Sequence, residues 1–173
     1  GEAYVDCLGG TVARCARQGG GVTRSMARGG SFGGYMTNGI GAQTDRFKCL
    51  ITHAGIATMA QFTGVTDHPA WWYLEMGGED PYADMERFDR YAPIRYVKNW
   101  KTPVLIIHGE RDYRCPIGEG LNLFEALQYH GVPSELLVFP DENPWKLTPR
   151  KLFPMLEPGP DFIGAPLQLQ PAP

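Results

Sequence analysis

The chain of 173 residues has few of the features that mark several protein classes. Its four cysteines (Cys7, Cys15, Cys49 and Cys115) have neither metal-ligand spacing nor the density of a disulfide scaffold. We interpret them as reduced structural thiols and expect no metal and no cofactor. No apolar run reaches the length of a membrane-spanning helix, and the first residues lack a basic-then-apolar signal sequence. These absences favour a cytoplasmic chain with no membrane partner.

Strong charge of one sign is also missing. The net charge is −3, and no stripe of lysine and arginine alternates with aromatic residues, so we expect no nucleic-acid partner. Hydrophobic residues make up 43% of the chain and charged residues 20%, a balance typical of globular proteins. The length suits one domain with a real core. Nothing in the composition indicates an oligomeric state.

Glycine and proline are unevenly distributed. The first 41 residues hold 12 of the 22 glycines, and nine of the 15 prolines fall between Pro140 and Pro173. Residues 1–28 show no clear strand or helix period, and the late prolines are spaced too closely for a stable helix. We therefore predict a poorly patterned segment over 1–28, an ordered domain over 29–145, and an extended or disordered proline-rich tail over 146–173.

The ordered part alternates between strand-like and helix-like patterns. Apolar runs predict buried strands over 47–52, 104–108 and 135–139, and a weaker strand over 22–28. Ile117, Leu121, Phe124 and Leu127 predict a helix between the last two strands. Strands separated by helical crossovers form a mostly parallel sheet with flanking helices, and ligands then bind beyond the carboxyl ends of the strands.

The pattern Gly29-Gly30-Ser31-Phe32-Gly33 matches G-x-S-x-G, the turn that exposes a serine nucleophile between a strand and a helix. Side chains at Gly29 and Gly33 are expected to collide with neighbouring elements, and Ser31 is expected to have a strained backbone. A helix should begin near Gly33. Asp112 follows the strand over 104–108, and a further strand comes after it, which is the chain order of α/β-hydrolase enzymes.

Several separate motifs resemble the catalytic domain of the prolyl oligopeptidase family of serine peptidases, in its acylaminoacyl-peptidase and dipeptidyl-peptidase branch. They lie, in order, at 29–38, 44–48, 96–103, 108–114 and 139–143. The resemblance covers 29–145 and implies a partial α/β-hydrolase fold acting on a peptide or acylated-peptide substrate. It assigns Ser31 as the nucleophile, Asp112 as the carboxylate that orients the catalytic histidine, and the backbone N–H of Phe32 as an oxyanion donor.

The chain also departs from that family. Pro144 stands where the family carries its catalytic histidine, and proline can act neither as a base nor as a hydrogen-bond donor. The family's β-propeller, the early strands and the loop with the second oxyanion donor have no counterpart, so we interpret the chain as a fragment or a decayed copy. Two hypotheses remain: a serine peptidase with little or no activity, or a non-catalytic pseudoenzyme or gene fragment that acts, if at all, as a binding module. The aromatic cluster Trp71-Trp72-Tyr73 fits either.

The four histidines differ in their expected places. His130 should lie at the far end of the helix that precedes the last strand, away from Ser31. His108 is expected to anchor the turn before Asp112 through hydrogen bonds. His53 follows a strand expected between those of Ser31 and Asp112, so it is the candidate substitute base. His68 is expected in a loop over the site.

Overall fold

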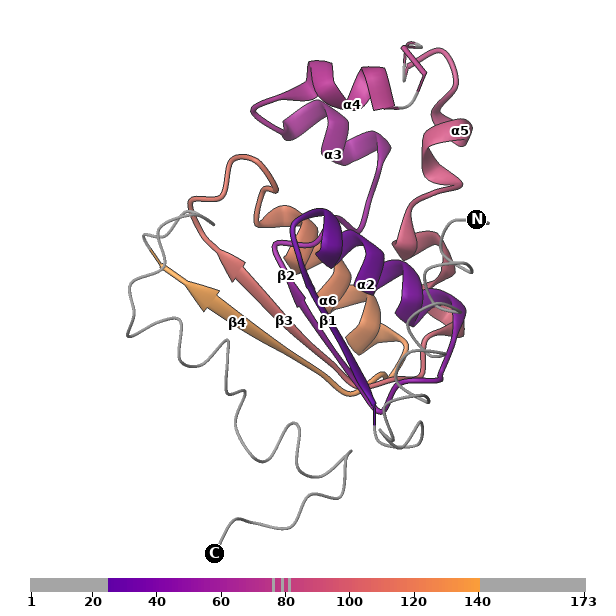
Figure 1. Cartoon of the computed structure of the whole chain (residues 1–173), viewed down its shortest axis with the longest axis vertical. Helices are drawn as coiled ribbons and strands as arrows, with labels where there is room; N and C mark the ends of the chain where they lie inside the picture. Colours follow the sequence, from indigo (N-terminus) through magenta and orange to yellow (C-terminus); the bar gives the residue numbers. More distant parts are fainter. Residues whose placement is uncertain (1–24, 76, 79, 81, 141–173) are drawn as a thin grey trace, which may run out of the picture.

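The computed structural model describes residues 25–75, 77–78, 80 and 82–140. Four strands alternate with helices along this part of the chain (Figure 1). In chain order the elements are β1 (Met26–Gly30), α2 (Phe32–Gln43), β2 (Cys49–His53), α3 (Ala60–Val65), α4 (Pro69–Glu75), α5 (Met85–Asp89), the 3₁₀ helix η2 (Pro93–Asn99), β3 (Val104–Gly109), α6 (Gly118–Tyr129) and β4 (Ser134–Phe139).

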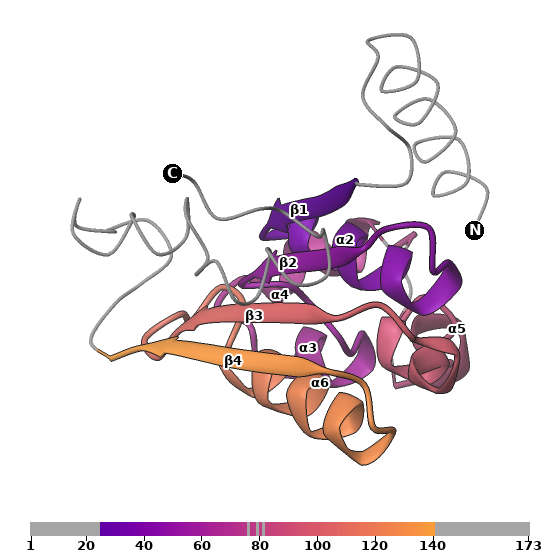
Figure 2. The ribbon, with the colours of Figure 1, turned by 90° about the horizontal axis from the view of Figure 1, so that it is seen from below.

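The strands form one sheet in the order β1-β2-β3-β4, and every pair is parallel (Figure 2). All six residues of β3 are buried, as expected for an apolar strand with a neighbour on each side. In β1, by contrast, Arg28 and Gly30 are exposed. Within the described residues β1 pairs only with β2. Its weak strand pattern is consistent with this position at an edge of the sheet, where fewer side chains are buried.

Alternate strand residues point to opposite faces, and each face has its own apolar cluster. Leu50, Val104 and Ile106 pack with Ala42 of α2 and Leu127 of α6, so both long helices cover the same face. The opposite face carries a second cluster, made of Ile51, Leu105, Ile107 and Phe139. Because the strands are parallel, their carboxyl ends, which precede Ser31, Ala54 and Glu110, meet at one edge.

Helices α3 and α4 lie beyond that edge (Figure 1). Trp72 is buried against Phe62, with ring centroids 5.0 Å apart in an edge-to-face arrangement. Trp71 is 44% exposed. The aromatic cluster of the sequence is thus divided between a core residue of these helices and a surface residue.

The observed strands overlap those predicted from the apolar runs, with boundaries shifted by up to four residues. One prediction in the last helix was wrong: Leu121 is 48% exposed, whereas Leu123 is fully buried. The buried face of α6 passes through Glu119, Leu123 and Leu127, and a charged residue within it hid the true register. Leu127 is buried and Phe124 packs against the core as predicted.

Some predictions lie outside the described residues. These are the character of 1–24, the proline-rich tail over 146–173 and the surroundings of Pro144. The three-part division of the chain therefore stays a prediction. Of the cysteines, Cys49 and Cys115 are described; both are buried and free.

Candidate active site at the carboxyl edge of the sheet

Ser31 occupies the single residue between β1 and α2. Its backbone has φ 56° and ψ −122°, in the left-handed half of φ that residues with side chains rarely adopt. Its N–H donates to His53 O at 2.9 Å, and its carbonyl accepts from Tyr35 N at 3.0 Å. The predicted strained turn is confirmed. The serine is presented at the start of α2, where free N–H groups favour negative charge.

The glycines of this turn have different roles. A Cβ on Gly29 would overlap the backbone carbonyl of Gly33 and lie 2.8 Å from Thr37 Oγ1. A Cβ on Gly34 would lie 2.7 Å from Gly55 Cα and 2.8 Å from His53 O. A Cβ on Gly33 would meet nothing within 4 Å, so the collision expected there was wrong. The second close approach of the turn belongs to Gly34, because that residue faces the loop after β2.

Asp112 lies in the loop after β3 and is 2% exposed. Its Oδ1 accepts hydrogen bonds from Arg114 N at 3.0 Å and Cys115 N at 2.8 Å. Its Oδ2 is buried and receives no hydrogen bond from the described part of the chain. Burial raises the pKa of the carboxyl, and the two backbone N–H groups and His108 oppose this shift. One oxygen of the carboxylate is therefore held in place, while the other has no donor among the described residues.

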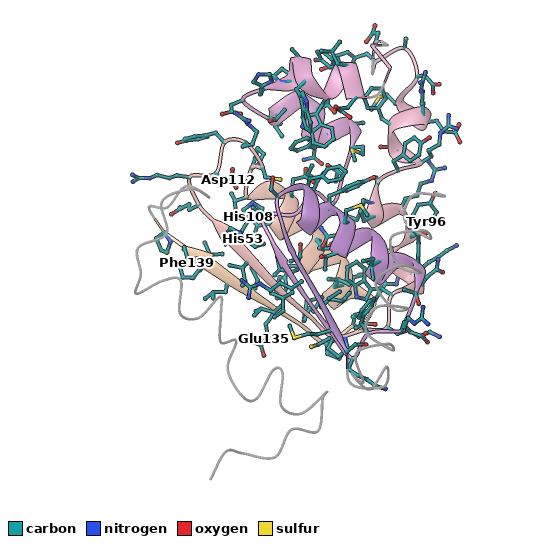
Figure 3. The ribbon with its side chains drawn as sticks, in the orientation of Figure 1. His53, Tyr96, His108, Asp112, Glu135 and Phe139 are labelled. Atoms are coloured by element: carbon teal, nitrogen blue, oxygen red, sulfur yellow. The ribbon has the colours of Figure 1, made fainter. Side chains whose placement is uncertain are left out.

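Ser31, His53 and Asp112 line a single pocket of about 220 Å³, completed by Gly30, Ala54, Arg114 and Cys115. Figure 3 shows His53, His108 and Asp112 close to one another at the carboxyl ends of β2 and β3. The structure thus brings together the predicted nucleophile, the predicted orienting carboxylate and the candidate substitute base. Phe32 follows Ser31 as the first residue of α2, and its ring is half exposed.

His53 is the last residue of β2, between the strands that lead to Ser31 and Asp112. Burial, followed by the nearby His108 and Arg28, lowers the pKa of its imidazole to about 4. The ring is therefore neutral at neutral pH. No hydrogen bond joins it to the Ser31 hydroxyl or to Asp112 Oδ2 among the residues described.

His108 and His130 lie as expected, and His68 lies in a loop, but its expected place over the site stays a prediction. His108 is fully buried and its Nε2 is 2.6 Å from Cys115 O, so it anchors the turn that carries Asp112. His130 caps the carboxyl end of α6, at the opposite edge from the pocket. His68 is exposed and directly precedes α4. Its neighbour Asp67 pairs with Arg114, which connects this loop to the pocket wall.

The lowered pKa of His53 predicts a pH-dependent stability. The unfolded chain takes up a proton near the usual pKa of 6.5 and the folded chain only near 4. The free energy of unfolding should therefore fall as pH falls through this window and level off below it. The effect of His53 has an upper limit of about 3 kcal/mol at 1.36 kcal/mol per pKa unit. Urea denaturation at pH 7 and pH 4.5 measures it.

The variant His53→Gln is the control for that pH dependence. It removes the titrating ring, so its stability should change less between the two pH values. Part of the change should remain, because burial also lowers the pKa of His108. The same loss of stability in the variant and the native chain would contradict the assignment.

Two further polar groups of this region did not stand out in the sequence. Arg114 Nε pairs with Asp67 Oδ1 at 2.6 Å across the loops beside the pocket. Glu119 is 1% exposed and accepts hydrogen bonds from the loop after β2. The sequence signal that could have identified Glu119 is the position of a charged residue within an apolar helical stripe.

Within the described ranges, no group of three histidine, cysteine, aspartate or glutamate side chains could hold a metal ion. In the same part of the chain, no helix is long and apolar enough to cross a membrane.

The parallel sheet, the strained serine turn and the aspartate at the same edge define an α/β-hydrolase fold. The same fold is found in an acylaminoacyl peptidase solved with Z-Gly-Gly-Phe-chloromethyl ketone, with a TM-score of 0.86 and 27% identity over 98% of this chain and 28% of that chain. The acylaminoacyl peptidase of Pyrococcus horikoshii gives a TM-score of 0.76 at 30% identity, over 81% of this chain and 23% of that chain.

Comparison of sequences leads to the family. Residues 3–162 match the Prolyl oligopeptidase family. Dipeptidyl-peptidase 5 of Porphyromonas endodontalis is 40% identical over 126 residues, which is 70% of this chain and 18% of that protein. The chain therefore belongs to the prolyl oligopeptidase family of serine peptidases, as its motifs indicated. It spans about a fifth of the length of the curated relatives that it matches.

Proposed function

We propose that this chain carries the nucleophile and the orienting carboxylate of a serine peptidase site. The observation that carries the proposal is the shared pocket of a strained, exposed Ser31 and a buried Asp112, one oxygen of which receives no hydrogen bond from the described residues. In the reaction, Ser31 Oγ adds to the scissile carbonyl and the C–N bond breaks. The amine then leaves with a proton, and water hydrolyses the acyl-serine ester.

The two other proposed roles follow from the position of Ser31. Phe32 is the first residue of α2, and its backbone N–H would donate to the oxyanion that forms on the attacked carbonyl. Asp112 Oδ2 would accept an N–H from the imidazole that removes the serine proton. The names of the relatives support a peptide or an N-acylated peptide as substrate.

We further propose that catalysis in this chain is impaired. Pro144 stands where the motif of the family carries the histidine, and proline has no group that can accept or return a proton. In subtilisin, loss of this base lowers turnover by about 10⁶. A hydroxyl without an adjacent base is a weak nucleophile at neutral pH.

His53 is the second candidate for that base, because it lines the same pocket as Ser31. A general base works best when its pKa lies near the operating pH. With a pKa of about 4, His53 is neutral but accepts protons poorly. This favours the alternative of a pseudoenzyme that binds a peptide or a partner at the pocket over a chain rescued by His53.

A fluorophosphonate probe tests these alternatives. We expect Ser31 to react at least about 10³-fold more slowly than the serine of an intact serine hydrolase, because His53, the candidate base among the described pocket residues, has a pKa of about 4. Time courses of labelling, followed by mass spectrometry, measure the rate and identify the residue. Ser31→Ala should remove whatever labelling is seen.

Two results would contradict the expectation in different ways. Rapid labelling that Ser31→Ala abolishes would show that another base is present, and a fall in His53→Ala would assign that role to His53. Residual labelling that persists in Ser31→Ala would show that the proposed nucleophile is wrong.

A further inference from the structure

Glu119 is a buried carboxylate that has no role in the proposed chemistry. It lies in the first turn of α6 and is 1% exposed. Its Oε2 accepts from Ala57 N at 2.8 Å and Thr58 N at 2.7 Å, and its Oε1 accepts from Thr58 Oγ1 at 2.7 Å. Burying a carboxylate is costly unless hydrogen bonds satisfy it. Three short bonds to one loop therefore make Glu119 a strong attachment between α6 and residues 57–58.

The same loop is attached at its other end to the serine turn. His53 O accepts the Ser31 N–H at 2.9 Å, and Asn38 Nδ2 of α2 donates to Ile56 O at 2.9 Å. The backbones of Gly34 and Gly55 approach so closely that neither position has room for a Cβ. Segment 53–58 is therefore held against the serine turn and α2 by hydrogen bonds and close backbone packing.

The segment that leads into α6 is attached to Asp112. Asp112 Oδ1 accepts from the amides of Arg114 and Cys115, and Glu119 N donates to Pro116 O at 2.9 Å. Glu119 follows Asp112 by only seven positions along the chain. The Glu119 carboxylate is thus the point at which the segment carrying Asp112 meets the loop held against Ser31.

We propose that Glu119 is a positioning residue that fixes Asp112 relative to Ser31 by joining the start of α6 to residues 57–58. This role rests on the proposed function, in which those two residues act together. Ala54 has φ 46° and lines the pocket, so the loop is held in a conformation that its own backbone does not favour. Such a conformation persists only where the surroundings enforce it.

Two variants separate this role from simple loss of packing. Glu119→Gln keeps an oxygen that can accept both backbone N–H groups, and its NH₂ can donate to Thr58 Oγ1. Glu119→Ala leaves the N–H groups of Ala57 and Thr58 without their acceptor. Leu127→Ala is the matched control, because Leu127 is fully buried on the same helix but lies in the sheet-facing core.

Amide hydrogen exchange of the full chain, followed residue by residue by NMR, tests the proposal. In Glu119→Ala, exchange at Ser31, Arg114 and Cys115 should rise on the order of tenfold more than exchange in β3, because local opening precedes global unfolding. Glu119→Gln should stay near the native pattern. Leu127→Ala should accelerate these amides and those of β3 in proportion.

The positioning role would be overturned if exchange in Glu119→Ala rose at Ser31 and Cys115 only in proportion to exchange in β3. It would also be overturned if exchange at Ser31 and Cys115 did not rise at all, or if Glu119→Gln behaved like Glu119→Ala. The fluorophosphonate rate, compared at equal folded fraction, should fall in Glu119→Ala but not in Leu127→Ala. Labelling that is independent of Ser31 would reject the peptidase proposal, whereas the exchange pattern tests the attachment itself, so the two failures are distinguishable.

Discussion

Replacing Pro144 with histidine is expected to raise hydrolysis of a chromogenic acyl-amino-acid or dipeptide substrate by about 10²-fold or more over the native chain. Loss of the base from a serine triad costs about 10⁶, so a poorly placed imidazole would still recover a substantial part. Asp112 Oδ2 is buried, receives no hydrogen bond from the described residues and belongs to the pocket that Ser31 lines. Steady-state release of the chromophore measures the gain.

Pro144→Gln is the matched control for this variant. It also removes the conformational restraint of proline, but it supplies no group that can take up the serine proton. Adding Asp112→Asn to Pro144→His should lower the gain, because the amide no longer stabilises the imidazolium. Equal activity of the histidine and glutamine variants, both folded by circular dichroism, would show that the absence of the histidine alone does not account for impaired catalysis.

The expected gain is partial because geometry limits it. A misplacement of about 1 Å at a reacting group can cost 10²-fold. Position 144 lies five residues beyond the end of β4 at Phe139, within a stretch rich in proline. By the proposed role of Glu119, the site also depends on the attachment of α6 to residues 57–58, which fixes Asp112 relative to Ser31.

Much of this site could be predicted from the sequence because its requirements are local. A strained serine between a strand and a helix needs glycine where another backbone approaches, so the pattern at 29–33 marks it directly. The buried strand over 104–108 is equally plain, since a continuous apolar run between proline and glycine has few other interpretations. Parallel pairing then places Ser31 and Asp112 at one edge.

Other features depend on contacts between distant segments. Glu119 did not stand out in the sequence, because only the fold brings Ala57 and Thr58 against it. One side chain of α6 was misassigned for the same reason: Leu121 is exposed, whereas Leu123 is buried. The low pKa of His53 likewise arises from burial beside His108 and Arg28 on separate strands.

The second large effect is expected at a glycine of the serine turn, where the sequence motif alone does not show which glycine is required. Gly29→Ala should lower the free energy of unfolding by about 3 kcal/mol or more, a fall in Tm of roughly 10 °C, because its Cβ would overlap the Gly33 carbonyl. That carbonyl also accepts the Thr37 hydroxyl at 2.9 Å, so it cannot move without disturbing the first turn of α2. Thermal unfolding followed by circular dichroism measures the loss.

Gly33→Ala is the internal control, since both residues are glycines of the same motif. Its Cβ would meet nothing within 4 Å and it lies within α2, where alanine is favoured over glycine by about 1 kcal/mol. The variant should be as stable as the native chain or slightly more stable. Equal losses at the two positions would mean that the motif needs backbone freedom at both glycines. A loss at Gly29 alone would show that close approach of the Gly33 carbonyl, rather than membership of the pattern, determines which glycine the turn requires.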